Sequence, residues 1–437
     1  MFDDPLSIDR RLQSGVRSLA SFRAALRAGG GEDHAFELVG RFVSRELLRE
    51  LADATKDPLA PALLRTAHAL YEAHALAPFD REHSAALRVA QHAIDQPERG
   101  HFTLSELASH ALADTRGQRA GYLAILGERA QPASDSALRR AEQRAELRSS
   151  VDKFIAADID LPGTAVLDQA ASVLERTREA FRTLAPRSFA ELIELGLGRD
   201  SRAAWPARLT PRSTAELLGD APWLAHATPD AFRVPRALGA ASHLRALAGL
   251  GAALRAAFAG PKQPFVLARD PYGLERATFG ALFAFLPAQE SFARRRLGVT
   301  PAGASDHRRA LARIYLVALR ECALRVTLRA PAFDGARALT RAYPELTFAA
   351  LGSELPPSLL GVFFTPGPGD AQRLAGLLLA AALNHDFTEQ HDDDWFRNPR
   401  AVEELRESAR GPAVTVADAA ALERGAALLV NWLAAAL

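Results

Sequence analysis

The residues best suited to chemistry lie together near the C-terminal end of the sequence. Residues 384–394 (NHDFTEQHDDD) hold two histidines among several carboxylates, and the candidate metal ligands are His385, Asp386, Glu389 and His391. Imidazole and carboxylate groups together suit zinc, manganese or iron. The two histidines are six positions apart, a spacing that does not bring both onto one face of a helix. Carboxylates also stabilise helix ends, so a metal site here is an alternative hypothesis rather than the first.

Other nucleophiles and metal ligands are sparse. Cys322 is the only cysteine, which excludes an internal disulfide and a cysteine metal site, and its apolar flanks predict a core position. The other histidines are scattered, and His243 would need a second histidine at Leu247 to complete a zinc-binding pair. Residues 294–296 are three consecutive arginines that could bind phosphate or a peptide carboxylate, although a solvated helix end explains them as well.

Helices must position these side chains, because alanine, leucine, arginine and glutamate dominate the chain and are the strongest helix formers. Apolar residues recur at three- and four-residue spacing in almost every segment. Residues 6–28 show the pattern, and one face of that segment carries Leu12, Val16, Leu19, Phe22 and Leu26. Only two short segments, Pro264–Ala268 and Leu360–Thr365, are candidates for strands. We therefore predict an all-α fold with little or no β-sheet.

The length of 437 residues exceeds one core of ordinary size and predicts two or three packed subdomains. Turn-forming residues gather at Gln131–Ser136, which predicts a break in the helical pattern there. We place an N-terminal helical subdomain at residues 1–130 and a C-terminal helical subdomain at residues 135–437.

Charge and composition exclude several classes of partner. The 53 basic and 52 acidic residues nearly cancel, so no basic excess indicates a nucleic-acid partner. Lysine occurs only at Lys56, Lys153 and Lys262, and a GC-rich bacterial genome is the simplest reason for an arginine content this high. No apolar run reaches the length of a membrane span, and the N-terminal residues lack the pattern of a secretory signal. We expect a cytoplasmic protein with no membrane partner.

Residues 394–399 form a distinctive string of two aromatics, a charge pair and a proline: Asp394, Trp395, Phe396, Arg397, Asn398 and Pro399. An apolar helical segment precedes the string, and a second helical segment with small residues follows it. This arrangement resembles the end of the oligoendopeptidase F, thimet oligopeptidase and carboxypeptidase Taq group of zinc metallopeptidases. The resemblance implies a multi-helix bowl or two-lobed helical fold with an internal channel that holds peptides.

The central motif of that family is altered in this chain. In the family, two histidines four residues apart bind zinc, the glutamate beside the first activates water, and a glutamate on a later helix is the third ligand. Here Ala248 and Ala252 stand at the histidine positions, Gly249 at the glutamate position, and Phe279 in place of the third ligand. The resemblance thus implies a degenerate site with no catalytic residue, no metal and no cofactor.

The first functional hypothesis is therefore a catalytically inactive protein that binds a peptide or protein partner, or regulates an active paralogue by association. A metal-dependent hydrolase with a relocated site at His385, Asp386, Glu389 and His391 is the second. A structural helical protein without a functional cleft is the third. Assembly into a homo-oligomer stays open in all three.

Overall fold

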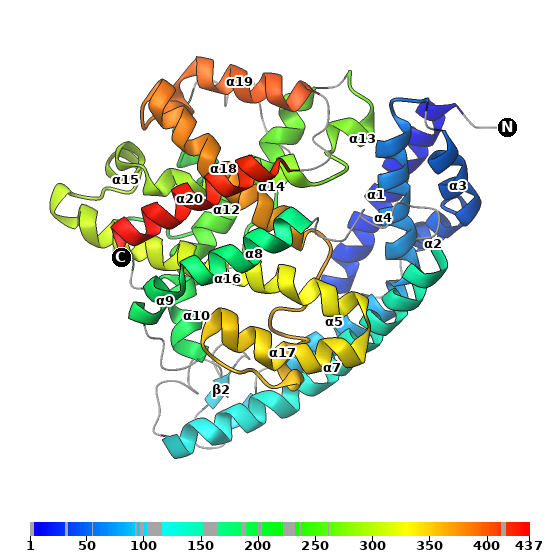
Figure 1. Cartoon of the computed structure of the whole chain (residues 1–437), viewed down its shortest axis with the longest axis horizontal. Coiled ribbons are helices and arrows are strands. Elements are labelled where there is room, and N and C mark those ends of the chain that lie inside the picture. Colours follow the sequence, from blue (N-terminus) through cyan, green and yellow to red (C-terminus); the bar gives the residue numbers. More distant parts are fainter. Residues whose placement is uncertain are drawn as a thin grey trace.

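The computed structural model describes residues 4–437 apart from short gaps. These gaps are residues 31–33, 55, 92–93, 97–99, 103–115, 152–163, 185–188, 200, 202, 220, 222–231, 236, 261 and 412–416. The predicted all-α fold is confirmed, since helices make up nearly all of the regular structure in the described ranges (Figure 1). Among the described helices, none combines the length and apolarity needed to cross a bilayer.

The helices follow one another along the whole chain. Those of the first half are α1 (Pro5–Ala28), α2 (His34–Glu37), α3 (Arg45–Asp53), α4 (Ala60–Ala75), α5 (Ala77–Gln91), α7 (Arg116–Val151), α8 (Thr164–Arg176), α9 (Arg178–Leu184), α10 (Phe189–Leu197) and α11 (Pro211–Glu216). Those of the second half are α12 (Ala240–Ala259), α13 (Phe265–Ala268), α14 (Leu274–Phe285), α15 (Glu290–Arg296), α16 (Ala304–Phe333), α17 (Ala336–Leu351), α18 (Asp370–His391), α19 (Pro399–Arg410) and α20 (Ala419–Ala436).

Short elements connect some of these helices. The 3₁₀ helices are η1 (Leu38–Arg41), η3 (Leu286–Ala288), η4 (Pro301–Gly303), η5 (Pro357–Leu359) and η6 (Trp395–Arg397). Two three-residue strands, β1 (Ile94–Gln96) and β2 (Gly100–Phe102), pair antiparallel as an isolated hairpin.

The N-terminal unit consists of α1 to α4 and has a hydrophobic core of its own. Asp4 caps α1 by accepting a hydrogen bond from the backbone N–H of Leu6, and Pro5 occupies the first helical position. The predicted apolar face of α1 is buried, with Leu12 and Phe22 almost fully inaccessible. This core gathers residues 8–77 and one distant residue, Val266 of α13. The unit stands at one end of the molecule, beside α13 (Figure 1).

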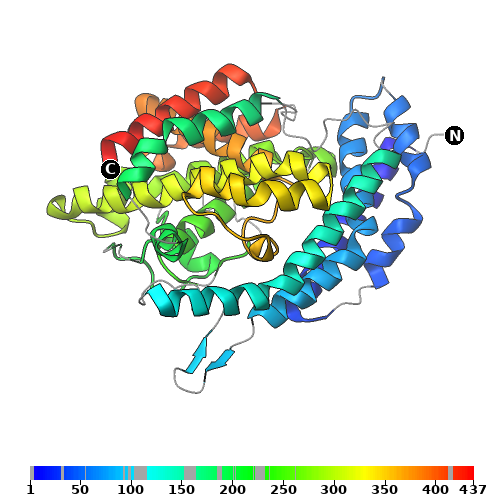
Figure 2. The same cartoon turned by 60° about the horizontal axis from the view of Figure 1, so that its bottom comes forward.

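Helix α7 joins the N-terminal unit to the rest of the molecule, which we call the body. It runs along the N-terminal unit and continues beneath the body (Figure 2). The predicted break at Gln131–Ser136 is wrong, because α7 continues through it with Pro132 inside the helix. The hydroxyl of Ser134 donates to the carbonyl of Ser358 and accepts from the N–H of Gly361, so this serine binds another segment rather than ending the helix. The division into subdomains at residues 130–135 stays a prediction.

The body is organised around four helices that pack side by side in the order α12, α14, α18 and α20. At each of the three interfaces, the backbones of the two helices approach so closely that a glycine in one helix has no space for a side chain. A Cβ added at Gly376 would lie 2.6 Å from the Cβ of Ala277 of α14, and one at Gly425 would lie 2.0 Å from the carbonyl oxygen of Leu378. Helix α16 crosses this layer and buries a long apolar face against it. The second and larger hydrophobic core lies here.

Both strand predictions are wrong. Residues 265–268 form helix α13, because the carboxylate of Asp9 accepts hydrogen bonds from the N–H groups of Phe265 and Val266 at 2.9 and 2.8 Å. An acceptor placed at these two donors stabilises the start of a helix. Residues 360–365 form turns after η5, where Gly361 contacts the backbone of Ala133 too closely for any side chain.

Candidate functional site

The positions that the resemblance assigns to the zinc motif lie on two helices, α12 and α14, that touch through their backbones. A Cβ added at Gly251 of α12 would lie 2.3 Å from the carbonyl oxygen of Phe279 of α14. One added at Gly280 would lie 2.9 Å from the carbonyl oxygen of Ala248. Phe279 itself is buried, with 3% of its surface exposed. We call this interface the seam; main-chain atoms and small residues fill it, which leaves no space for a metal held between side chains of both helices.

Position 249, which the resemblance aligns with a catalytic glutamate, is also packed. A Cβ added at Gly249 would lie 2.9 Å from the Phe232 ring and 3.3 Å from the carbonyl oxygen of Arg233. The non-helical segment that contains these two residues therefore lies directly against α12. A glutamate at position 249 would have to displace this segment.

A buried ion pair closes one end of the seam. The guanidinium of Arg255 on α12 donates to the carboxylate of Glu275 on α14 at 2.5 Å and to the carbonyls of Leu267 and Ala268. The two charged side chains are 1% and 7% exposed. Burial raises the pKa of Glu275, and the neighbouring Arg255 opposes that rise. A buried pair with this many hydrogen bonds fixes the helices relative to one another.

His243, nearer the start of α12, stacks on the ring of Trp205 with 4.8 Å between ring centroids. It is 5% exposed, and burial lowers its pKa. A neutral imidazole stacked on an indole is a core residue of this fold.

The string at residues 394–399 forms a structural corner between α18 and α19. Trp395 and Phe396 are buried in the body core, where Trp395 packs on Phe283 and Phe396 on Phe292. The side chain of Asn398 accepts from the N–H of Arg400 and caps α19, whose first residue is Pro399. The remaining charged pair of the string, Asp394 and Arg397, forms a 3.7 Å ion pair. Packing and capping thus account for the composition of the string.

The four candidate metal ligands do not come together. Asp386 forms a bidentate ion pair with Arg424 of α20, which lowers the pKa of Asp386. His391 pairs with Glu404 of α19 at 3.0 Å. His385 and Glu389 are exposed. Within the described ranges, no group of three or more histidine, cysteine or acidic side chains is arranged to hold a metal ion.

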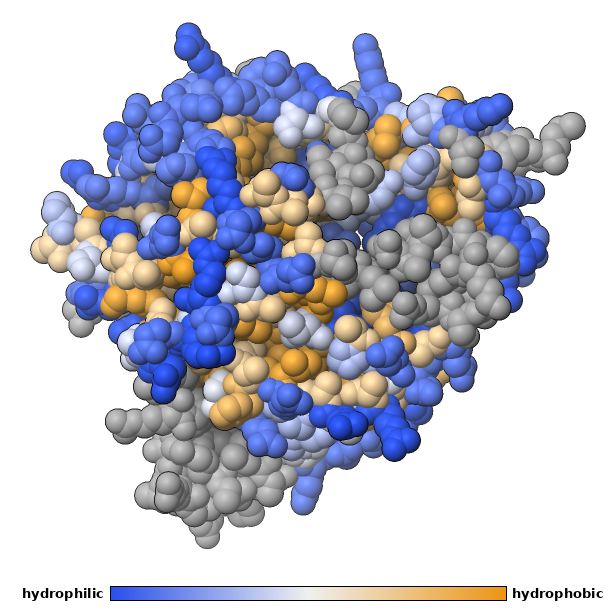
Figure 3. All heavy atoms as spheres, viewed as in Figure 1, coloured by the Kyte–Doolittle hydropathy of each residue, from blue (hydrophilic) through white to orange (hydrophobic). Residues whose placement is uncertain are grey.

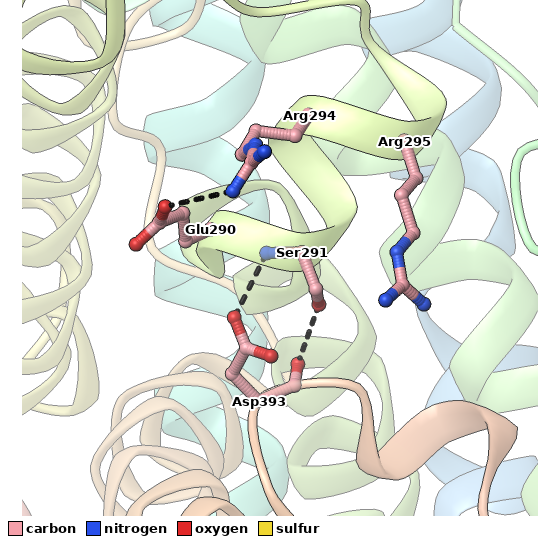
Figure 4. Close-up of a pocket in the computed structure, with 5 residues that line it drawn as sticks. All are labelled: Glu290, Ser291, Arg294, Arg295 and Asp393. Carbon is pink, nitrogen blue, oxygen red and sulfur yellow. Dashed lines mark hydrogen bonds and ion pairs between the residues drawn. The ribbon is translucent and has the colours of Figure 1, made fainter. Parts of the chain in front are cut away.

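A pocket of about 440 Å³ lies beside the corner, lined by Glu290, Ser291, Arg294, Arg295 and Asp393 (Figure 4). Its charged groups already have partners. Arg294 pairs with Glu290 at 3.4 Å, and Arg295 turns to the other side of α15 and pairs with Asp394 at 3.0 Å. The N–H of Ser291 donates to the carboxylate of Asp393. Of the arginine run at 294–296, Arg295 binds the corner, Arg294 pairs within α15, and the guanidinium of Arg296 packs against Gly219, so the three groups do not converge on one ligand.

Arginines do converge elsewhere, between the N-terminal unit and the body. On the face seen in Figure 3, apolar residues reach the surface in the middle of the body and hydrophilic residues dominate its rim. Three chain segments contribute the side chains that define this arginine recess: Arg23, Arg27, Arg233, Arg269 and Arg276. Repulsion from Arg233 and Arg23 acts on Arg27, and repulsion from Arg276 and Arg23 acts on Arg269. Such repulsion is screened beyond about 10 Å, so Arg27 lies near Arg233 and Arg23, and Arg269 lies near Arg276 and Arg23.

Burial lowers the pKa of Arg23 and Arg276, and burial together with the repulsion lowers the pKa of Arg269 to about 10. The side chains still reach solvent, since Arg23 is exposed and Arg276 keeps 39% of its side-chain surface accessible.

The sequence contains no signal for the arginine recess. Its members are five of 50 arginines and are separated by up to about 250 positions, so neither a motif nor a periodicity connects them. Comparison of the chain with family models and with curated proteins finds no match.

Proposed function

We propose that this chain is a catalytically inactive protein on a scaffold similar to that of the zinc oligopeptidases, and that it binds a peptide or protein partner. The seam is the observation that carries the proposal. At the positions that the resemblance assigns to the ligands and the general base, Ala248, Gly249 and Phe279 pack against backbone and aromatic groups, and Ala252 has no metal-binding side chain. A helical scaffold that keeps these elements without the reactive side chains acts by association, including association with an active relative.

The loss of peptidase chemistry is tested by metal analysis and peptide cleavage on one preparation. We expect far less than one zinc ion per chain. We also expect no chelator-sensitive cleavage of a mixture of fluorogenic peptide substrates. One ion per chain together with chelator-sensitive cleavage would reject the proposal.

Binding is tested by fluorescence anisotropy with a library of labelled peptides of mixed charge. We expect saturable binding of at least one class of peptide, and competition by the same peptide without its label. If no peptide binds and no partner protein can be cross-linked to the purified chain, a purely structural role replaces the proposal.

A further inference from the structure

We propose that the face of the N-terminal unit that holds α13 is the binding site of the peptide partner, and that α13 occupies this site as an internal competitor. The connection at residues 260–273, which carries α13, is called the strap. The inference rests on the proposed function and deepens it, because it names the site and the chemistry of the bound segment. The ligand is an apolar segment that presents two consecutive backbone N–H groups at the start of a helix.

The strap packs on the core of the N-terminal unit and not on that of the body. Val266 is fully buried in the core of the N-terminal unit, and Phe265 and Leu267 pack against the same core. Helix α13 lies against both α1 and α4. Among the described residues of the strap, none is part of the core of the body. The strap can therefore leave the N-terminal unit without opening the larger core.

The N-terminal unit binds the strap through its backbone as well as its side chains. The carboxylate of Asp9, on the buried face of α1, accepts hydrogen bonds from the N–H groups of Phe265 and Val266 at 2.9 and 2.8 Å. Hydrogen bonds to an ionised acceptor are stronger than those between neutral groups. Because the first N–H groups of any helix lack partners within the helix, a partner segment that begins a helix offers the same two donors.

The body holds the strap at its other end. Arg255 donates to the carbonyls of Leu267 and Ala268 at 3.0 and 2.5 Å, which binds the C-terminal end of α13 to α12. Gly260 and Gly273 have φ angles of 83° and 74°, and they turn the chain sharply where the strap leaves α12 and enters α14. A partner that displaces α13 thus separates the strap from the N-terminal unit, while Arg255 keeps it on the body.

Competition within the chain determines how tightly an external segment binds. A tethered segment competes at an effective concentration on the order of millimolar. The apparent affinity for an external peptide is reduced by the fraction of molecules in which the site is free of α13. Weakening α13 without altering the site therefore raises the affinity for the same segment supplied from outside.

The test is fluorescence anisotropy of the full chain with a labelled peptide of residues 262–270 (KQPFVLARD). The variant Val266→Ser weakens the internal competitor and leaves α1 and α4 unaltered. The matched control is Val402→Ser, because Val402 is also buried but belongs to the core of the body. We expect Val266→Ser to bind the peptide at least about tenfold more tightly than the unaltered chain, and the control to differ from the unaltered chain by less than about twofold.

A second substitution tests the role of the carboxylate. In the Val266→Ser background, Asp9→Asn removes the charge that accepts the two amides. We expect the affinity for the peptide to fall by at least about fivefold, because hydrogen bonds to a neutral oxygen are weaker. An unchanged affinity would show that the peptide binds elsewhere.

Hydrogen exchange of the unaltered chain gives a readout that does not depend on how the variants fold. With the peptide at about ten times its dissociation constant, we expect the amide protons of Phe265 and Val266 to exchange at least about tenfold faster, because the peptide replaces them at Asp9. The inference is overturned if the peptide binds none of the chains, if this exchange does not change, or if Val266→Ser and Val402→Ser bind the peptide equally.

Failure of the proposed function is distinguishable from failure of this inference. A different peptide that binds the unaltered chain, with an affinity that neither Val266→Ser nor Asp9→Asn changes, would support the proposed function and reject α13 as its competitor. Zinc-dependent cleavage would reject the proposed function, while displacement of α13 by the peptide could still be measured.

Discussion

Helix α14 carries Glu275 of the seam and Arg276 of the arginine recess, and the arginines of the two regions have different partners. In the seam, Arg255 is fully buried and donates to one carboxylate and two backbone carbonyls. In the arginine recess, Arg276 lies 4.0 Å from the carboxylate of Asp270, which already accepts two backbone N–H groups. The Nε atoms of Arg255 and Arg276 both lack a hydrogen-bond partner within the described residues. The two arginines therefore differ in the acceptors of their other nitrogens: the fold supplies a carboxylate and two carbonyls to Arg255, and it places one more distant carboxylate beside Arg276.

The largest effect is expected when the structural arginine is removed. The variant Arg255→Met leaves the carboxylate of Glu275 buried without a cation, and we expect the free energy of unfolding to fall by about 3–5 kcal/mol. Urea denaturation of the variant and of the unaltered chain measures this difference in the free energy of unfolding. The double variant Arg255→Met/Glu275→Leu should recover part of the loss, because no charge then remains uncompensated. A single variant as stable as the unaltered chain would show that the pair does not hold the seam.

The next effect comes from forcing the two backbones of the seam apart. A methyl group at position 251 would overlap the carbonyl of Phe279, so Gly251→Ala should lower the free energy of unfolding by roughly 1–3 kcal/mol. The control is Gly127→Ala in α7, where the nearest atom lies 3.4 Å from the added carbon. That change should be neutral or stabilise the helix by up to about 1 kcal/mol. Equal behaviour of the two variants would contradict the close contact.

Acidification tests two buried histidines of the body, His243 of α12 and His307 of α16. Burial lowers the pKa of both below the ordinary value of 6.5. The unfolded chain therefore binds more protons than the folded chain just below pH 6.5, and stability falls as the pH decreases through that range. We expect a loss of about 1 kcal/mol between pH 7 and pH 5.5, which His243→Gln/His307→Gln should reduce. An unchanged slope in that variant would assign the loss to other groups.

The smallest effect on stability is expected when an arginine of the arginine recess is removed. Because the charged form of Arg269 is disfavoured in the folded chain, Arg269→Gln should leave the free energy of unfolding unchanged or raise it by less than about 1 kcal/mol. The sign is opposite to that for Arg255→Met. Thermal melts of both variants in one low-salt buffer measure the difference, and a loss of stability in both would remove the distinction between the two arginines.

Periodicity was sufficient to predict the helical fold because the apolar faces of helices such as α1 are regular and buried, as Leu12 and Phe22 show. It failed where a tertiary contact decides the local structure. Pro132 and its neighbours suggested a turn, but Ser134 binds the segment around Gly361 and α7 continues. Apolar residues before Arg269 suggested a strand, but Asp9 caps a helix there from 256 positions away.

The candidate site was less accessible to prediction than the fold. The resemblance pointed to Ala248 and Phe279, and the structure places both at the interface of α12 and α14, but it does not test the role that the resemblance implies. The sequence does not show which few of its many arginines become neighbours. The packing of the N-terminal unit against α13 decides this, and no local pattern of residues predicts that packing.

The contact between Asp9 and α13 also bears on how the chain matures during synthesis. The N-terminal unit leaves the ribosome first, but Val266, which completes its core, and the two amides that bind Asp9 are made about 250 residues later. Until then, the place of Val266 in the core of the N-terminal unit is unfilled, and the carboxylate of Asp9 lacks its two amide donors. The N-terminal unit therefore completes its core only after α13 has been translated. A nascent chain that stops before that point exposes this apolar surface to chaperones and proteases.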